Sequence, residues 1–255
     1  MYGICNLSMI PLRSEPSDKS EMVSQLLFGE AVEVIDTRDQ WLKVRLFFDD
    51  YTGWIDRKQI INVNEEEIKK DSSNSTTVTL DIVQIVIFNQ SNIIPVVLGS
   101  SLPLYFDKKF RIGKTEYQYD GMIKTFSSND ASNIVEHAYM YLNAPYLWGG
   151  RSPFGIDCSG FTQMVFKLCG IRLKRDSWNQ AEQGKTVQLT EAKPGDLAFF
   201  DNAEGKITHT GMILSNNKII HASGRVHIDK LDQQGIFNDE TNKYTHNLKI
   251  IKRIF

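Results

Sequence analysis

The stretch Asp157-Cys158-Ser159-Gly160-Phe161 decides the fold of the second half of the chain, because it marks a change from loop to helix. It follows a loop rich in glycine, residues 149–155. Beyond it, apolar residues recur at spacings of three and four up to Leu168, and Gly170 is a typical stop signal. The pattern predicts a helix from about Cys158 to Leu168.

Cys158 would open this helix, where the first backbone amides lack helical partners and the helix dipole is positive. That position predicts a lowered thiol pKa, which a nucleophilic cysteine requires because the thiolate is the reactive form. The alternative is a buried cysteine that packs as a small apolar side chain. The rest of the sequence favours the nucleophile.

Two downstream histidines offer a base for this thiol. His209 lies in the alternating segment 207–214, on the face shared with Gly211, which leaves room beside the ring. His221 lies on the next predicted strand and would orient the ring of His209. A two-residue Asn216-Asn217 turn would put the histidines on opposite faces, so the hypothesis requires a loop of odd length or a bulge.

The remaining histidines have no expected part in this chemistry. His137 lies on a predicted helix, His227 past the turn at Gly224, and His246 in a polar loop. We interpret all three as structural or solvent-facing. The three cysteines fit neither a disulfide framework nor a zinc site, so reduced thiols are expected, without a metal or other cofactor.

The amino-acid composition limits the kinds of partner that the protein is expected to bind. The 29 Lys and Arg against 31 Asp and Glu give a formal charge of −2, so nucleic acid is not an expected partner. No apolar run reaches the roughly 18 residues of a membrane helix, which argues against membrane insertion. The first residues lack an export signal, so a cytoplasmic protein is expected, or a periplasmic or secreted one if a leader has been removed.

Four segments follow from the hydrophobic pattern. Short alternating segments predict a small β module over residues 1–63, and the polar residues 64–76 predict a linker. Residues 77–126 are again rich in β pattern, with turn signals. Residues 127–255 begin with helical spacing, with Asn129 or Asp130 as its cap, and continue with strands, which indicates an α+β fold.

The sequence resembles the NlpC-type papain-like peptidases of bacterial cell-wall metabolism over about the last 130 residues. The motifs that carry the resemblance are Pro145-Tyr146-Leu147-Trp148-Gly149-Gly150, Asp157-Cys158-Ser159-Gly160-Phe161, Arg175-Asp176-Ser177 with Gln180, Pro194-Gly195-Asp196-Leu197, Thr208-His209-Thr210-Gly211 and His221-Ala222-Ser223-Gly224-Arg225. The two β modules ahead of this domain look like the bacterial SH3-like barrels of one subgroup, the γ-D-glutamyl-L-diamino-acid endopeptidases.

This resemblance implies a papain-like domain preceded by two SH3-like β-barrels, and a catalytic trio of Cys158, His209 and His221. The substrate would be a murein peptide with a free N-terminal L-Ala, cut between D-Glu and the diamino acid. The residues implied in substrate binding are Tyr51, Tyr146, Trp148, Asp157, Ser159, Asp176, Ser177 and, by a looser local match, Glu21 beside Val23. Asp176 could equally serve as a helix N-cap.

Three alternatives stay open. The chain could be a secreted hydrolase that cuts intact stem peptides, with the barrels as wall anchors. It could be a wall-binding protein whose peptidase domain is inactive, or an acyltransferase in which an amine resolves the thioester. The implied mechanism has the Cys158 thiolate attack the γ-carbonyl, His209 protonate the departing amine, and the Cys158 amide contribute to an oxyanion hole.

Overall fold

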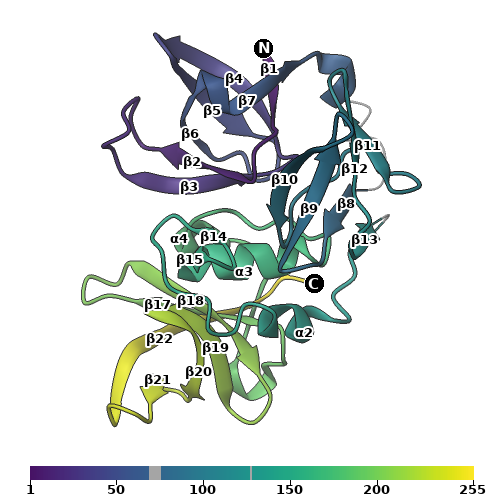
Figure 1. Ribbon diagram of the computed structural model, residues 1–255. Coiled ribbons are helices and arrows are strands. Elements are labelled where there is room, and N and C mark those ends of the chain that lie inside the picture. The colour runs from purple at the N-terminus through teal and green to yellow at the C-terminus, as the bar shows by residue number, and fades with distance from the viewer. Residues whose placement is uncertain (69–75, 127) are drawn as a thin grey trace. The chain divides into compact units, whose positions relative to one another are not determined.

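The computed structural model describes residues 1–68, 76–126 and 128–255, which fall into two units (Figure 1). The first unit is Met1–Asp130 and the second is Ala131–Phe255. Their boundary lies four residues beyond the expected start of the last domain. Each unit has its own core and is described by itself.

The first unit begins with a sheet of seven strands among its described residues, in the order β3-β2-β6-β5-β4-β1-β7. The strands are β1 (Tyr2–Cys5), β2 (Met9–Arg13), β3 (Met22–Leu27), β4 (Ala31–Arg38), β5 (Trp41–Leu46), β6 (Thr52–Asp56) and β7 (Ile60–Val63), with a 3-10 turn at Arg57–Gln59. Alternate residues such as Leu42, Val44 and Leu46 form its core. The expected turn precedes β6, where the Tyr51 N–H donates to Asp49 Oδ1 at 2.9 Å.

A second β module completes the first unit. Its strands are β8 (Thr76–Thr79), β9 (Val83–Phe88), β10 (Asn92–Val97), β11 (Lys109–Ile112), β12 (Thr115–Gln118) and β13 (Ile123–Phe126). They pair as a β10-β9-β12-β11 sheet and a β13-β8 ribbon. Ile4 and Phe28 of the first module share one apolar cluster with Tyr117 of the second, which is why the two modules form one unit.

The expected linker differs from the structure at its start. Residues 65–68 are helical, and Ile68 is buried in the cluster that both modules share. A single apolar residue in a polar stretch gave no pattern from which this could be predicted. Residues 69–75 lie outside the described part of the chain, and strand β8 begins at Thr76.

The second unit places helices ahead of an antiparallel sheet, as the sequence predicts. Its elements are α2 (Ile134–Tyr139), β14 (Arg151–Ser152), β15 (Gly155–Ile156), α3 (Cys158–Lys167), α4 (Ser177–Gln180), β16 (Lys185–Val187), a 3-10 turn at Leu189–Glu191, β17 (Leu197–Asp201), β18 (Ile207–Leu214), β19 (Lys218–Ser223), β20 (Arg225–Leu231), β21 (Gly235–Asn238) and β22 (Lys243–Arg253).

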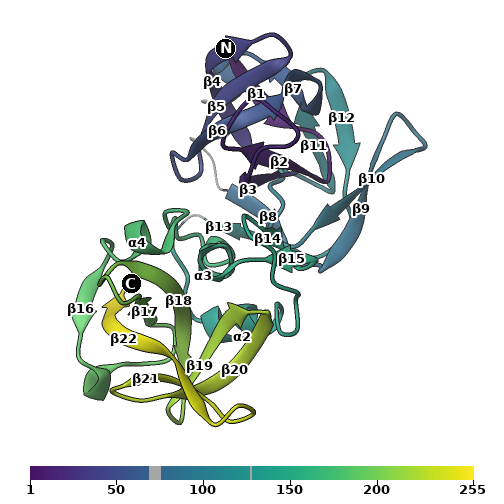
Figure 2. The ribbon, with the colours of Figure 1, turned by 90° about the vertical axis from the view of Figure 1, so that its left-hand side faces the viewer.

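The sheet of the second unit closes on itself (Figure 2). Its order is β16-β22-β17-β18-β19-β20-β21, and the long strand β22 pairs with β21 as well as β17. Register shifts in both pairings bend β22 between its two partners. Apolar side chains including Phe200, Ile213 and Ile219 form the core on one face of this sheet. Helix α3 is buried along its whole length and packs against β18 and β19.

Several expectations can be compared with these elements. Helix α3 and strand β18 are confirmed, whereas the cap of α2 is Asn133, so the assignment to Asn129 or Asp130 is wrong. Strands β20 and β21 were not predicted. Taken over the whole chain the fold is mostly sheet, so the α+β description applies to the second unit. Within the residues that the structure describes, no helix combines the length and apolar character needed to cross a bilayer.

Candidate active site

Cys158 is the first residue of α3, as predicted, and its side chain lies in a buried position. Asp157 is the N-cap in an extended conformation, with φ −92° and ψ 177°. Its Oδ1 accepts the Gly160 N–H at 2.7 Å. This cap satisfies one amide of the first turn and fixes the start of the helix at Cys158.

A buried ion pair holds the loop around the nucleophile. Arg175 donates from Nη2 to Asp157 Oδ2 at 2.6 Å and from Nη1 to Oδ1 at 3.0 Å, and the two side chains are only 1% and 8% exposed. The same Nη1 donates to Ser159 Oγ at 3.0 Å, and the Gly149 N–H donates to Asp157 Oδ2 at 2.8 Å. Asp157 thus ties three segments of the chain together.

This arrangement bears on two residues implied in substrate binding. The side chains of Asp157 and Ser159 both face Arg175, and the Asp157 carboxylate accepts from Arg175, Gly149 and Gly160. Their direct effect in this structure is to position the Cys158 loop. Arg175 belongs to a quoted motif but had no role assigned, because sequence alone does not show that it is buried against Asp157.

The thiol pKa differs from expectation. Burial, and then the negative charge of Asp157, raise the pKa of Cys158 to about 12. Backbone N–H groups of Thr210 and Ser159 and the charge of Arg175 act in the opposite direction and offset only part of it. The predicted lowering is therefore wrong for the free protein. Desolvation outweighs the helix dipole, so the thiol is neutral and a base must remove its proton.

His209 and His221 lie on one face of the sheet, as the hypothesis requires. Three residues, 215–217, connect β18 to β19, and the register pairs Gly211 with His221. The odd loop length keeps His221 on the face of residues 209 and 211. A Cβ added at Gly211 would lie 2.8 Å from the Cβ of His221, so only glycine leaves space there. His209 Nε2 and His221 Nδ1 are 2.9 Å apart.

Asp229 on β20 extends the chain of hydrogen bonds. Its Oδ2 lies 3.2 Å from His221 Nε2, and Asn238 Nδ2 donates to its Oδ1 at 3.0 Å. A carboxylate only accepts, so His221 carries its proton on Nε2 and accepts at Nδ1 from His209 Nε2. The remaining nitrogen of His209, Nδ1, is then the free acceptor that a general base needs.

Burial keeps the two relay histidines neutral. It lowers the pKa of His209 well below its ordinary value, and the neighbouring His221 lowers it further. Burial also lowers the pKa of His221, although the hydrogen bond to Asp229 offsets part of this. Burial raises the pKa of the Asp229 carboxyl, but the hydrogen bonds from His221 and Asn238 and the nearby imidazole rings outweigh it, so the net shift is downward. The relay is thus a carboxylate with two neutral rings.

Two histidines interpreted as structural or solvent-facing belong to this cluster. The rings of His246 and His209 stack with centroids 4.1 Å apart, and His227 Nε2 lies 3.1 Å from Asp229 Oδ2. His246 was assigned to a polar loop but lies in β22, and His227 was excluded because β20 was not predicted. His137 is confirmed as buried on its helix, with Nδ1 3.5 Å from the Cys169 sulfur.

The other residues of the second unit that are expected to contact the substrate differ in exposure. Tyr146 is about one-third exposed, and burial, followed by the charges of Cys158 and Asp157, raises its pKa to about 12. Trp148 is largely exposed. Asp176 holds the N-cap position of α4 without a side-chain cap bond, and Ser177 is buried. Asp176 therefore caps α4 by backbone position only.

Comparison with known proteins agrees with this geometry. A model described as NlpC/P60 family matches residues 143–245, and one described as bacterial dipeptidyl-peptidase Sh3 domain matches residues 12–60. A Bacillus cereus protein named gamma-D-glutamyl-L-lysine dipeptidyl-peptidase is 30% identical over 230 residues, which are 81% of this chain and 68% of that protein. The protein of the same name from Bacillus subtilis is 32% identical over 215 residues, 78% and 71% of the two chains.

The chain belongs to the NlpC/P60 family. It is a cysteine peptidase, with Cys158 as its candidate nucleophile. A crystal structure of an NlpC/P60 family protein from Bacillus cereus superposes with a TM-score of 0.82 over 100% of this chain and 99% of that chain. At 24% identity, this match shows that the fold is shared along the entire chain.

Two residues implied in binding lie in the SH3-like part of this NlpC/P60 chain. Tyr51 precedes β6 and packs partly against the core of the first module. Glu21 is exposed immediately before β3, where its carbonyl oxygen accepts the Ser14 N–H at 3.0 Å. Val23 of β3 packs against the same core as Tyr51, so it presents no charged group to a ligand.

Proposed function

We propose that this NlpC/P60 peptidase hydrolyses the γ-D-glutamyl–diamino-acid bond of murein peptides that carry a free N-terminal L-Ala. One observation carries the proposal. Two proteins named gamma-D-glutamyl-L-lysine dipeptidyl-peptidase are similar to this chain, and the matched region covers more than two thirds of each of them. The match of residues 12–60 to an Sh3 domain named for bacterial dipeptidyl-peptidases supports the same specificity. A dipeptidyl-peptidase releases two residues from a free amino terminus, which is the cut proposed here.

In the proposed reaction, His209 Nδ1 takes the thiol proton as the Cys158 sulfur bonds to the γ-carbonyl carbon of D-Glu. Collapse of the tetrahedral intermediate breaks the C–N bond, and His209 returns the proton to the departing amine. Water then attacks the thioester and gives one proton to His209, the C–S bond breaks to release the dipeptide, and His209 returns the proton to the Cys158 sulfur. The Gly160 amide is held by Asp157, so we assign the oxyanion to the Cys158 N–H.

The substrate contacts follow as proposals. Tyr51, Tyr146 and Trp148 would supply aromatic walls for the peptide, and Asp176 and Ser177 polar contacts. We further propose Glu21 as the acid that meets the L-Ala amine, since a cationic amine needs a carboxylate partner when it leaves water. If Glu21 binds the amine, Glu21→Gln should raise KM and leave kcat nearly unchanged.

We also retain the SH3-like assignment of the second β module as a proposal.

The decisive experiment is digestion of L-Ala-γ-D-Glu-L-lysine peptides, with the L-Ala amine free or acetylated, followed by mass analysis. The free peptide should yield the dipeptide L-Ala-D-Glu, and acetylation should abolish cleavage. Cys158→Ala should abolish turnover, whereas Cys169→Ala, which removes another buried thiol of the same unit, should retain it.

Other outcomes would replace the proposal. Equal cleavage of acetylated peptides or intact stems would make the protein a hydrolase of the assembled wall. Transfer of the dipeptide to an added amine in preference to water would make it an acyltransferase. Full turnover by Cys158→Ala would remove the catalytic assignment.

We also propose that the protein recycles released wall peptides in the cytoplasm. Cell fractionation followed by detection of the protein with an antibody would test that location.

A further inference from the structure

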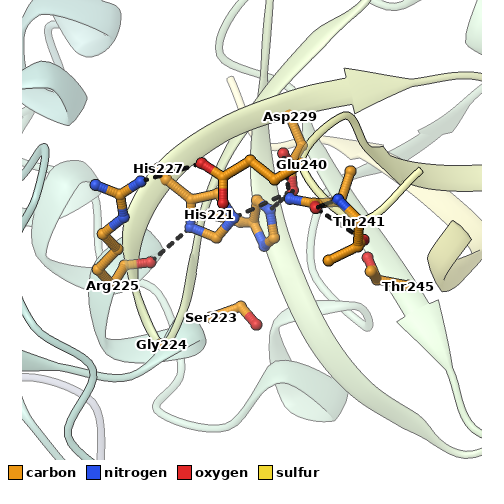
Figure 3. Close-up of a pocket in the computed structure, with 10 residues that line it drawn as sticks. His221, Ser223, Gly224, Arg225, His227, Asp229, Glu240, Thr241 and Thr245 are labelled. Carbon is orange, nitrogen blue, oxygen red and sulfur yellow. Dashed lines mark hydrogen bonds and ion pairs between the residues drawn. The ribbon is translucent and has the colours of Figure 1, made fainter. Parts of the chain in front are cut away.

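A cavity of about 470 Å³ opens beside the far end of the histidine relay (Figure 3). Its lining includes His221, His227, Asp229, Asn238 and Glu240. His209 contacts the Nδ1 side of His221, whereas the cavity is lined by His227 and Asp229, which lie at its Nε2 side. The cavity therefore offers access to the relay by a small ligand.

Three potential metal ligands converge in this cavity. Asp229 Oδ2 lies 3.2 Å from His221 Nε2 and 3.1 Å from His227 Nε2, and one ligand atom from each residue lies within 4.8 Å of the others. A tetrahedral zinc ion with bonds of about 2.0–2.2 Å separates its ligand atoms by roughly 3.3 Å. The two spacings to Asp229 Oδ2 are close to that value. Two imidazoles and a carboxylate are ligands that zinc accepts.

The hydrogen bonds around His227 indicate that a cation is favoured at this point. His227 Nδ1 lies 2.9 Å from the carbonyl oxygen of Arg225, which can only accept, so Nδ1 carries a proton. In the neutral ring, Nε2 then directs a lone pair at the Asp229 carboxylate. Two facing acceptors repel each other unless a second proton or a metal ion lies between them.

The surroundings also match those of metal-binding side chains. A ligating histidine commonly donates its second N–H to a carbonyl, as His227 does to Arg225, and a ligating carboxylate is held by a further donor, as Asn238 holds Asp229. These contacts fix the ring and the carboxylate before a metal arrives.

We propose that His221, His227 and Asp229 bind Zn²⁺, with water from the cavity in the fourth position, and that the bound ion switches the peptidase off. The metal would take Nε2 of His221, so the proton of that ring must lie on Nδ1. His221 then donates to His209 Nε2, and the proton of His209 lies on Nδ1. Each ring keeps one proton, but the nitrogen that should accept the Cys158 proton is already protonated.

The binding test uses the full chain carrying Cys158→Ala, which removes the nucleophile as a competing metal ligand. Calorimetric titration with Zn²⁺ should give one site, and Co²⁺ should give the visible absorption of a tetrahedral complex. His227→Ala in this background should weaken binding by at least ~10-fold. Asp239→Asn, which removes an exposed carboxylate beside Glu240, should leave binding unchanged.

The inhibition test uses the active protein and rests on the proposed function. Zn²⁺ should inhibit peptide cleavage reversibly, with recovery on addition of EDTA, and His227→Ala should require at least ~10-fold more Zn²⁺ relative to its own metal-free rate. Far-ultraviolet circular dichroism checks that His227→Ala is folded. His227→Gln serves as a second variant in case His227→Ala does not fold.

Two results would overturn the site. One is the absence of Zn²⁺ binding by Cys158→Ala, which would place any inhibitory metal on the thiol. The other is equal binding by the His227 variants. If Cys158→Ala binds Zn²⁺ and the active protein cleaves no murein peptide, the proposed function fails while the metal site stands. If cleavage occurs and bound Zn²⁺ does not slow it, the switch fails.

Discussion

Two polar clusters serve the catalytic unit, and they hold charge in different ways. The Asp157–Arg175 cluster keeps a permanent ion pair out of water, with two parallel hydrogen bonds and further donors from Gly149 and Gly160. The His209–His221 relay is also buried, but its rings are kept neutral and only Asp229 is charged. The first cluster fixes positions, and the second can move protons.

The physical reason lies in what each cluster must do. A bidentate pair with all its partners satisfied tolerates burial and holds one geometry. A general base has to accept a proton, and an imidazole can do so only when it is neutral and one of its nitrogens is unprotonated. Breaking the first should therefore cost folding energy, and breaking the second should cost rate.

The largest expected effect is on stability. Arg175→Leu leaves the Asp157 carboxylate buried without its cation, and we expect the free energy of unfolding to fall by about 3–5 kcal/mol in urea titration. Lys206→Ala, which breaks the exposed pair with Glu204, is the matched control and should cost less than about 1 kcal/mol. A loss below about 1 kcal/mol for Arg175→Leu would mean that the two clusters do not differ as described.

The second effect is on rate. His221 Nε2 and Asn238 Nδ2 both donate to Asp229 oxygens, so Asp229→Asn introduces an N–H that faces groups which themselves donate. We expect kcat to fall on the order of 10²-fold with KM nearly unchanged, because the amide favours the wrong tautomer of His221.

A pH profile separates this role from a purely structural one. The charge and hydrogen bond of Asp229 raise the pKa of His221, so their loss should move the acidic limb of kcat/KM to lower pH. Asp239→Asn should leave the profile unmoved. A loss of rate in Asp229→Asn without any shift of the limb would contradict the relay.

The smallest effect concerns His246. Burial lowers its pKa to about 4, so between about pH 6.5 and pH 4 the unfolded chain binds a proton that the folded protein does not. As far as His246 is concerned, the free energy of unfolding therefore keeps its full value above pH 6.5 and falls as the pH drops from 6.5 to 4. His246→Phe keeps a ring against His209 and should make the decline between pH 7 and pH 5 shallower in urea titration. Identical slopes for the two proteins would refute this contribution.

Prediction from sequence worked where one local pattern decides the structure. The periodicity after Cys158 defines α3, and the alternation of residues 207–214 defines β18, including the inward face of His209. The requirement of an odd loop between the histidines is met by residues 215–217. Prediction failed for β20 and β21, although residues 225–229 of β20 alternate polar and apolar side chains, and with these strands Asp229 and His227 were missed.

The sequence by itself determined the family and indicated the candidate nucleophile and its two histidines, because these depend on local motifs and spacing. Only the tertiary structure decided the state of the thiol, since burial and the charge of Asp157 outweigh the helix dipole and raise its pKa. It also decided which side chains complete the site. Asp229, His246 and Arg175 reach it through register, strand bending and a buried ion pair, and such long-range contacts leave no periodic trace in the chain.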